Sequence, residues 1–166
     1  MIIVSNSSPL VALSVIGKLH LLQDKFNTIM IPEAVWKEIA LDGRDKPGAD
    51  HILRSKWIKI EFLQNKKVAE SLEKDIDYGE SEAIALALEM DADIVLLDDK
   101  LARAVAKSLG LNILGTVGIL IWAKKAGLIE SLRTELHKLL IHGNFRLSNP
   151  LIRMALHEVG EGDGQQ

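Results

Sequence analysis

The stretch "ADIVLLDDKLARAV" constrains the fold more than any other part of the chain. Four aliphatic residues, 94–97, follow one another with no polar residue between them, and Asp98 and Asp99 come directly after. A run that is apolar on both faces is typical of a strand buried inside a parallel sheet. Because parallel strands need crossover connections, which are usually helices, this run predicts an α/β fold.

Other short β-branched runs alternate with segments of helical spacing, as a parallel sheet requires. We expect further strands at residues 2–5, 28–31 and 113–114. The stretch "WIKIEFL" alternates apolar and charged residues, which favours a half-exposed or edge strand.

Helix signals fill the intervals between these strands. The first helix is predicted to have Ser8 as its N-cap and Pro9 in its first position, with an apolar stripe that runs as far as Leu19. From about Gly118 onward the chain is expected to be helical, with breaks near Gly127 and in "HGNFRLSNP".

Composition narrows the classes of function. The 166 residues are 48% hydrophobic and 26% charged, which indicates one globular domain. The absence of cysteine excludes disulfides, thiolate metal sites and a catalytic thiol, and it favours a reducing compartment. A net charge of -3 gives no global attraction to nucleic acid, so such a partner would need a local site.

With no signal peptide and no apolar run of roughly 18 residues, we expect a soluble cytoplasmic protein without membrane contact.

Polar residues follow the predicted strands at one edge of the sheet, where open α/β folds bind their ligands. The expected members of this group are Asn6, Glu38, Glu80, Asp98 and Asp99. Crowded carboxylates repel one another and lose solvation, so they are stable only when a cation neutralises them or when they take up protons. Mg²⁺ or Mn²⁺ prefers such oxygen ligands, and phosphodiester hydrolysis is the chemistry that these ions support.

Four segments carry a resemblance to a known family: "IIVSNSSPLVAL", "IPEAVWKEI", "DYGESEAIALALEMDADIVLLDDKLAR" and "LNILGTVGIL". In this order and spacing the chain resembles the PIN-domain family of metal-dependent ribonucleases, and more closely its VapC-like branch, which has "DTSPL" near the start. The resemblance implies a three-layer α/β/α sandwich around a central parallel sheet of about five strands. Residues 1–127 would form the PIN-like domain, 128–158 a C-terminal helical extension of it, and 159–166 a disordered tail.

The resemblance also implies an activity and partners. The chain would be the toxin of a toxin–antitoxin pair, a homodimer that cleaves single-stranded RNA with Mg²⁺ or Mn²⁺ and binds a small antitoxin protein. Glu38, Glu80 and Asp99 would be the acidic ligands, with Asp98 as a neighbour in the same catalytic site. Ser8 would support the first position of the site, and Thr116 would line the pocket.

Asn6 departs from the family, which has aspartate at this position. An amide offers a carbonyl oxygen but no charge, so both metal affinity and turnover should fall. Three accounts stay open: a natural weakened or inactive member, an engineered substitution, or a site in which the remaining acids suffice.

Each of these residues also has a structural alternative. Glu80 could form a helix-capping pair with Asp77, and Asp98 or Asp99 could cap the helix that follows them. Glu38 could be a solvated glutamate beside an apolar helix face, and Asn6 and Ser7 could be turn residues. The five histidines lack the spacing of a metal site. The lysine and arginine side chains between positions 100 and 125 could form a phosphate-steering patch, or they could simply be a solvated face.

Two alternative functions follow from these possibilities. The chain could be a non-catalytic PIN-like module that binds RNA or a protein partner. It could also be a structural dimer whose acids are all helix caps. No P-loop, dinucleotide fingerprint or nucleophile elbow points to other chemistry.

Overall fold

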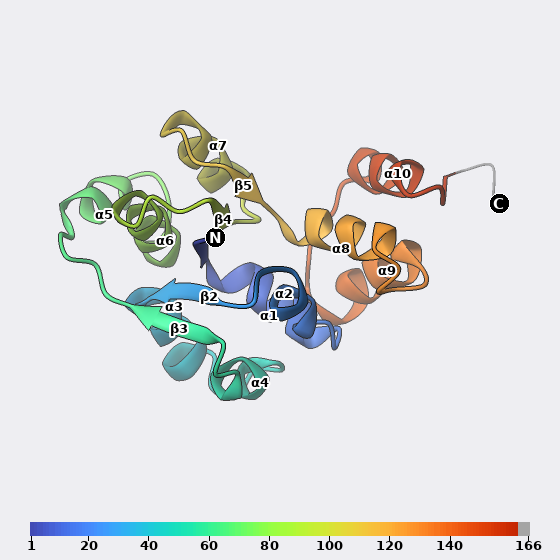
Figure 1. Cartoon of the computed structure of the whole chain (residues 1–166), viewed down its shortest axis with the longest axis horizontal. Coiled ribbons are helices and arrows are strands. Elements are labelled where there is room, and N and C mark those ends of the chain that lie inside the picture. The colour runs from blue at the N-terminus through green and yellow to red at the C-terminus, as the bar shows by residue number, and fades with distance from the viewer. Residues whose placement is uncertain (163–166) are drawn as a thin grey trace.

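The structure is a computed structural model that describes residues 1–162 of the chain. Strands and helices alternate along most of it, as Figure 1 shows. In chain order the elements are β1 (Ile3–Ser5), α1 (Ser7–Val15), α2 (His20–Phe26), β2 (Ile29–Pro32), α3 (Glu33–Lys37), the π-helical turn η1 (Glu38–Asp42), α4 (Ala49–Arg54), β3 (Ile58–Glu61), α5 (Lys67–Leu72), α6 (Tyr78–Glu89), β4 (Ile94–Leu96), α7 (Lys100–Ser108), β5 (Ile113–Leu114), α8 (Thr116–Lys125), α9 (Leu132–His142) and α10 (Asn149–Glu158).

The five strands form one sheet in the order β3-β2-β1-β4-β5, and every neighbouring pair is parallel. β1 lies at the centre, where Ile3 pairs with Ile94 of β4 and Val4 pairs with Met30 of β2. All strands therefore end at the same edge of the sheet, as the sequence predicted. β3 is an edge strand, which confirms the interpretation of "WIKIEFL".

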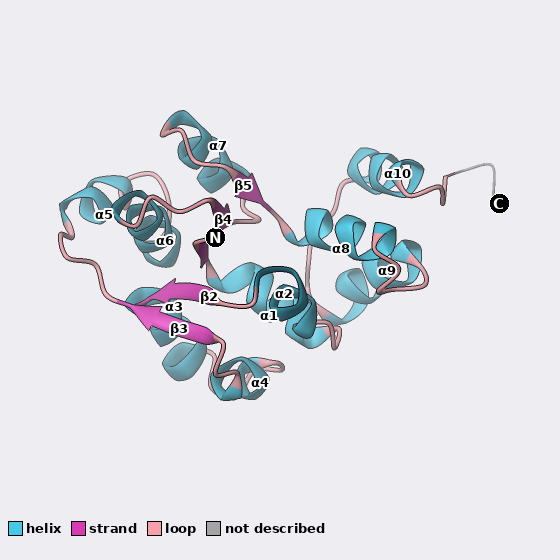
Figure 2. Cartoon of the chain, viewed as in Figure 1, coloured by secondary structure: helices cyan, strands magenta, loops and turns pink. Residues whose placement is uncertain are grey.

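Both faces of the sheet are covered by helices, which are drawn in cyan on both sides of the strands in Figure 2. Alternate residues of a strand join different core clusters: Ile3 packs with helices α1, α2, α8 and α9, whereas Val4 packs with α6 and α7. In β4, Leu96 belongs to the first cluster and Val95 to the second. This period of two explains why residues 94–97 are apolar throughout.

The first helix differs from the prediction at both ends. Asn6, not Ser8, is the N-cap residue of α1, and Pro9 occupies the third helical position. Proline is tolerated there because the N–H groups of the whole first turn have no partner within the helix. The helix ends at Val15, since Gly17 has a φ of 73°, which breaks the apolar stripe before Leu19.

The C-terminal helices pack onto the first core cluster, to which α9 and α10 contribute Leu136, Leu139 and Leu156. In the described part of the predicted tail, Glu161 accepts hydrogen bonds from the backbone of Leu132 and Arg133. The rest of the predicted tail, residues 163–166, lies outside the described residues. Within residues 1–162, no helix is long and apolar enough to cross a membrane.

Candidate metal centre

Glu38 reaches the sheet edge from a helix that changes its winding at this residue. α3 ends at Lys37, and the π-helical turn η1 begins at Glu38; such turns are frequent at functional sites. Oε2 of Glu38 accepts a hydrogen bond of 2.6 Å from Oγ of Ser7. Its Oε1 lies against Gly79, where an added Cβ would overlap it. Gly79 thus lets the Glu38 carboxylate approach the start of α6.

Glu80 lies one residue further, in the first turn of α6, and forms a capping box with Asp77. Oδ1 of Asp77 accepts from the backbone N–H of Glu80 at 2.8 Å, and Oε1 of Glu80 accepts from the N–H of Asp77 at 3.2 Å. The capping pair that the sequence suggested is therefore present, and it does not by itself exclude a ligand role for Glu80. Burial, then the nearby charge of Asp77 and more weakly that of Asp99, raise the pKa of Glu80 to about 7.

The same two causes act on Glu38. Burial raises its pKa, the hydrogen bond from Ser7 opposes this effect, and the charges of Asp77 and Asp42 add to it. Glu38 and Glu80 are thus both in surroundings that disfavour the ionised carboxylate. A nearby cation would remove that penalty.

Asp98 is fixed by the segment that follows β5. Its Oδ1 accepts from the backbone N–H of Thr116 at 2.7 Å, and its Oδ2 accepts from the hydroxyl of Thr116 at 2.6 Å. Gly115 leaves room for this contact, because an added Cβ would lie 2.9 Å from Oδ1 and 2.7 Å from Nη1 of Arg103. Burial raises the pKa of Asp98, against the hydrogen bonds from Thr116 and the charge of Arg103.

Asp99 is the N-cap of α7, where its Oδ2 accepts from the N–H of Ala102 at 3.0 Å. The capping alternative is confirmed here too. The cap involves only one of the two carboxylate oxygens, so the residue can still offer Oδ1 to a cation. A capping role and a ligand role are compatible at Asp99.

Asn6 is buried where β1 passes into α1, with only 3% of its surface exposed. Its backbone N–H donates to the carbonyl oxygen of Leu96 at 3.1 Å, which places it beside the end of β4. Among the described residues, the side-chain oxygen Oδ1 of Asn6 has no hydrogen-bond partner. A buried carbonyl oxygen without a partner costs about 1–3 kcal/mol, so a water molecule or an ion is expected to satisfy it.

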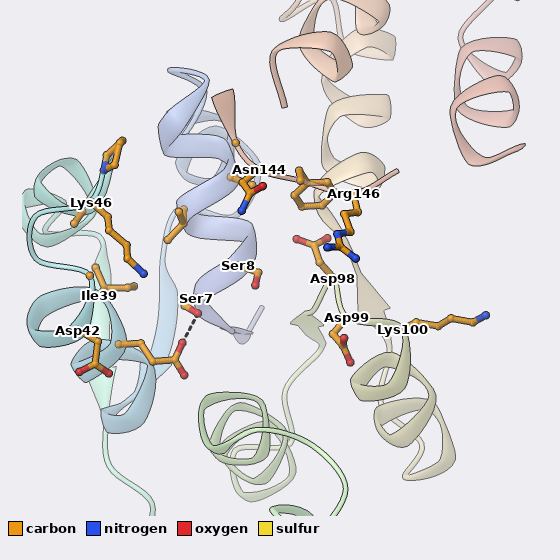
Figure 3. A pocket seen from close by; sticks show the side chains of 18 residues that line it. Ser7, Ser8, Ile39, Asp42, Lys46, Asp98, Asp99, Lys100, Asn144 and Arg146 are labelled. Carbon is orange, nitrogen blue, oxygen red and sulfur yellow. Dashed lines mark hydrogen bonds between the residues drawn. The ribbon is translucent and has the colours of Figure 1, made fainter. Parts of the chain in front are cut away.

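Four segments enclose a cavity of about 670 Å³ at this edge, shown in Figure 3. Its acidic end is lined by Ser7, Ser8, Glu38, Asp42, Asp98 and Asp99. Of the other predicted site residues, Glu80 interacts with Asp99 through its charge, Thr116 holds Asp98, and Asn6 precedes Ser7. The structure therefore brings the predicted residues to one edge of the sheet, although Glu80, Asn6 and Thr116 do not line the cavity.

The chemistry of these groups fits a hard divalent cation. The donors are all oxygens, the buried Asn6 Oδ1 lacks a partner among the described residues, and neighbouring acids raise the pKa of Glu38 and Glu80. Within residues 1–162, however, no three His, Cys, Asp or Glu side chains are already arranged to hold one ion. Each carboxylate is held by its own hydrogen-bond partner, so a bound ion would have to draw them inward.

Sequence reasoning missed the residues that hold the carboxylates. Ser7, not Ser8, donates its hydroxyl proton to Glu38, and Gly79 and Gly115 provide the space for Glu38 and Asp98. The available signal was a glycine directly before Glu80 and another directly before Thr116, in "YGES" and "LGTV". A glycine next to a polar residue at a helix start can indicate a close approach of another chain segment.

The fold and this edge define an α/β protein with a parallel sheet of five strands and a polar site at the carboxyl ends of its strands. The sequence pattern of the PIN domain family DUF3368 matches residues 2–161, which is nearly the whole chain. The protein therefore belongs to the PIN domain family. The match includes the C-terminal helices and so extends beyond residue 127. Members of this family typically use divalent metal ions. No curated protein sequence matches the chain significantly.

Proposed function

We propose that this protein is a metal-dependent endoribonuclease of the PIN type and the toxin of a toxin–antitoxin pair, weakened by Asn6. The observation that carries the proposal is the unpartnered oxygen of Asn6, buried at the sheet edge where carboxylates from two other segments line the cavity and Glu80 interacts with Asp99 through its charge. Membership of the PIN domain family supports it. Single-stranded RNA is the proposed substrate. The proposed partners are a second copy of the chain, which would form a homodimer with it, and a small antitoxin protein.

Some residues of the site would bind the metal ion, and others would position these ligands. Glu38, Glu80, Asp98 and Asp99 would hold Mg²⁺ or Mn²⁺, and Asn6 would add a neutral carbonyl oxygen. When bound, such an ion supplies positive charge to a phosphate and lowers the pKa of a water molecule. Ser7, Thr116 and Arg103 are positioning residues, because they hold Glu38 and Asp98 by hydrogen bonds or charge.

The test is cleavage of a labelled single-stranded RNA in Mn²⁺ by this protein and by Asn6→Asp. We expect Asn6→Asp to cut faster, since it restores a charged ligand at the first position. Asp99→Asn in each background is the control. Asparagine caps helices about as well as aspartate, so this variant should keep α7 and lose cleavage.

A second candidate function is a non-catalytic module that binds RNA through the same edge. It is favoured by Asn6 itself and by the capping roles of Glu80 and Asp99, which explain two acids without a metal. If Asn6→Asp and the original protein are both inert although Mn²⁺ stabilises each, this function replaces the nuclease. If Mn²⁺ stabilises neither protein, the metal site itself is refuted.

A further inference from the structure

The cavity of about 670 Å³ has a basic part that the acidic residues leave unexplained. Besides the acidic residues, its lining includes Lys46, Lys100 and Arg146. Figure 3 shows Lys46 and Arg146 on opposite sides of α1. A cavity of this size can hold a ligand of several chemical groups. Both negative and positive side chains therefore line the same cavity.

Both cations are available to a ligand. Among residues 1–162, the Lys46 ammonium and the Arg146 guanidinium have no ion-pair or hydrogen-bond partner. By contrast, Lys124, Lys125 and Lys138 of the C-terminal helices all form ion pairs. Arg146 is thus exposed and, among the described residues, without an ion-pair partner, unlike these three lysines.

The position of Arg146 is set by its neighbours in the chain. It lies between α9 and α10, where Phe145 and Leu147 pack against the core and Arg146 between them is exposed. The backbone N–H of Phe145 also donates to the carbonyl oxygen of Leu139 in α9 at 3.3 Å. The partly buried side chains on either side of it therefore anchor the backbone that carries this guanidinium.

We propose that Lys46 and Arg146 bind backbone phosphates of a single-stranded RNA next to the phosphate at the acidic end. The inference rests on the proposed function and adds which residues hold the strand. A net charge of -3 gives the whole protein no attraction to a polyanion, so a strand that enters an acidic site needs local cations. The planar guanidinium of Arg146 suits a phosphate, which it can contact through two parallel hydrogen bonds.

The experiment measures binding of a short fluorescein-labelled oligouridine to the full chain in EDTA, over a series of salt concentrations. For a single strand, each phosphate contact contributes about 0.7 to the slope of log K against log salt. Arg146→Ala should bind roughly tenfold more weakly, and its slope should be about 0.7 smaller. Arg153→Ala is the matched control, because Arg153 is also exposed and close in sequence, on α10, but does not line the cavity.

The outcomes separate this inference from the proposed nuclease. If Arg146→Ala and Lys46→Ala keep the affinity and salt slope of the original protein, the phosphate contacts are refuted even if cleavage in Mn²⁺ persists. If they lose affinity and slope while no variant cleaves RNA, the phosphate contacts stand and the nuclease falls. If the original protein does not bind the oligouridine at all, the phosphate contacts are refuted. A change with Arg153→Ala equal to that with Arg146→Ala would also overturn the assignment.

Discussion

The carboxylates at the sheet edge and the carboxylate of Glu161 lie in opposite surroundings. At the edge, burial and neighbouring acids raise the pKa of Glu38 and Glu80. Burial also acts on Glu161, but hydrogen bonds from Leu132, Arg133 and Ser131 and the charge of Lys124 outweigh it and lower its pKa. The ionised carboxylate is thus disfavoured at the sheet edge and favoured at Glu161.

The difference separates a region shaped for a ligand from one shaped for folding. Glu161 has its donors within the chain, where it accepts at 2.7 Å from the N–H of Leu132 at the start of α9. The buried Asn6 oxygen has none among the described residues. Proteins keep such destabilising arrangements mainly where function needs them. The following variants test this contrast, from the largest expected effect to the smallest.

Asn6→Asp should have the largest effect, because it adds a buried charge where the present oxygen has no partner. We expect a loss of about 3 kcal/mol of unfolding free energy in EDTA. Mn²⁺ should recover most of this loss, since a ligand that binds only the folded state stabilises it. Thermal unfolding with and without Mn²⁺ measures both effects. Asn65→Asp, which adds the same charge at an exposed position, should change neither.

Gly79→Ala should weaken Mn²⁺ binding at the proposed site without unfolding the protein. The new Cβ would displace the carboxylate of Glu38, which is the flexible end of a long side chain, so the backbone can stay in place. We expect roughly tenfold weaker Mn²⁺ binding, as for the loss of a residue that orients a ligand. Titration of Mn²⁺ by calorimetry measures it, with Gly118→Ala in α8 as the control. An unchanged affinity would mean that Glu38 is not a ligand.

Glu161→Gln should lower the unfolding free energy by about 1 kcal/mol at pH 7, because it weakens the hydrogen bonds to the start of α9. The folded pKa of Glu161 lies below the usual 4.5, so its charge stabilises the fold above that pH. The difference between the two proteins should shrink as the pH falls below 4.5. Urea unfolding at several pH values tests this, with Glu158→Gln, an exposed ion-pair partner of Lys125, as the control.

Glu80→Gln should have the smallest effect and the opposite sign. It removes a carboxylate whose ionised form is disfavoured and keeps an oxygen that can accept from the N–H of Asp77. We expect a gain of about 0.5–1 kcal/mol in EDTA and a smaller stabilisation by Mn²⁺. Glu70→Gln, at an exposed position of α5, should change neither quantity. A loss of stability equal to that of Glu161→Gln would mean that the two regions do not differ.

The sequence predicted the parts of this contrast that depend on local patterns. The aliphatic run before Asp98 predicted the buried strand β4, and the three-residue spacing from Asp77 to Glu80 predicted the capping box. These signals are local because strand burial and helix capping involve neighbouring residues. Because all strands of a parallel sheet end at the same edge, the approximate location of the candidate site could also be predicted.

Contacts between distant segments could not be predicted in this way. Nothing near Glu38 indicates that its carboxylate would lie against Gly79, and nothing near Arg146 indicates that it would line the cavity. The N-cap of α1 was assigned to Ser8 because Pro9 was expected in the first helical position, although proline is accepted throughout the first turn. Such details depend on packing between segments far apart in the sequence.

The central place of β1 has a consequence for synthesis. Of the candidate site residues, Asn6 leaves the ribosome first. However, β1 gains its second neighbouring strand only when β4 pairs with it, and the paired residues Ile3 and Ile94 are 91 residues apart. At about 5–20 residues per second, translation takes on the order of ten seconds to cover that interval. The acidic residues therefore remain scattered along an unfolded nascent chain for most of its synthesis. A polypeptide released before residue 94 lacks β4, Asp98 and Asp99, so it cannot assemble this edge of the sheet.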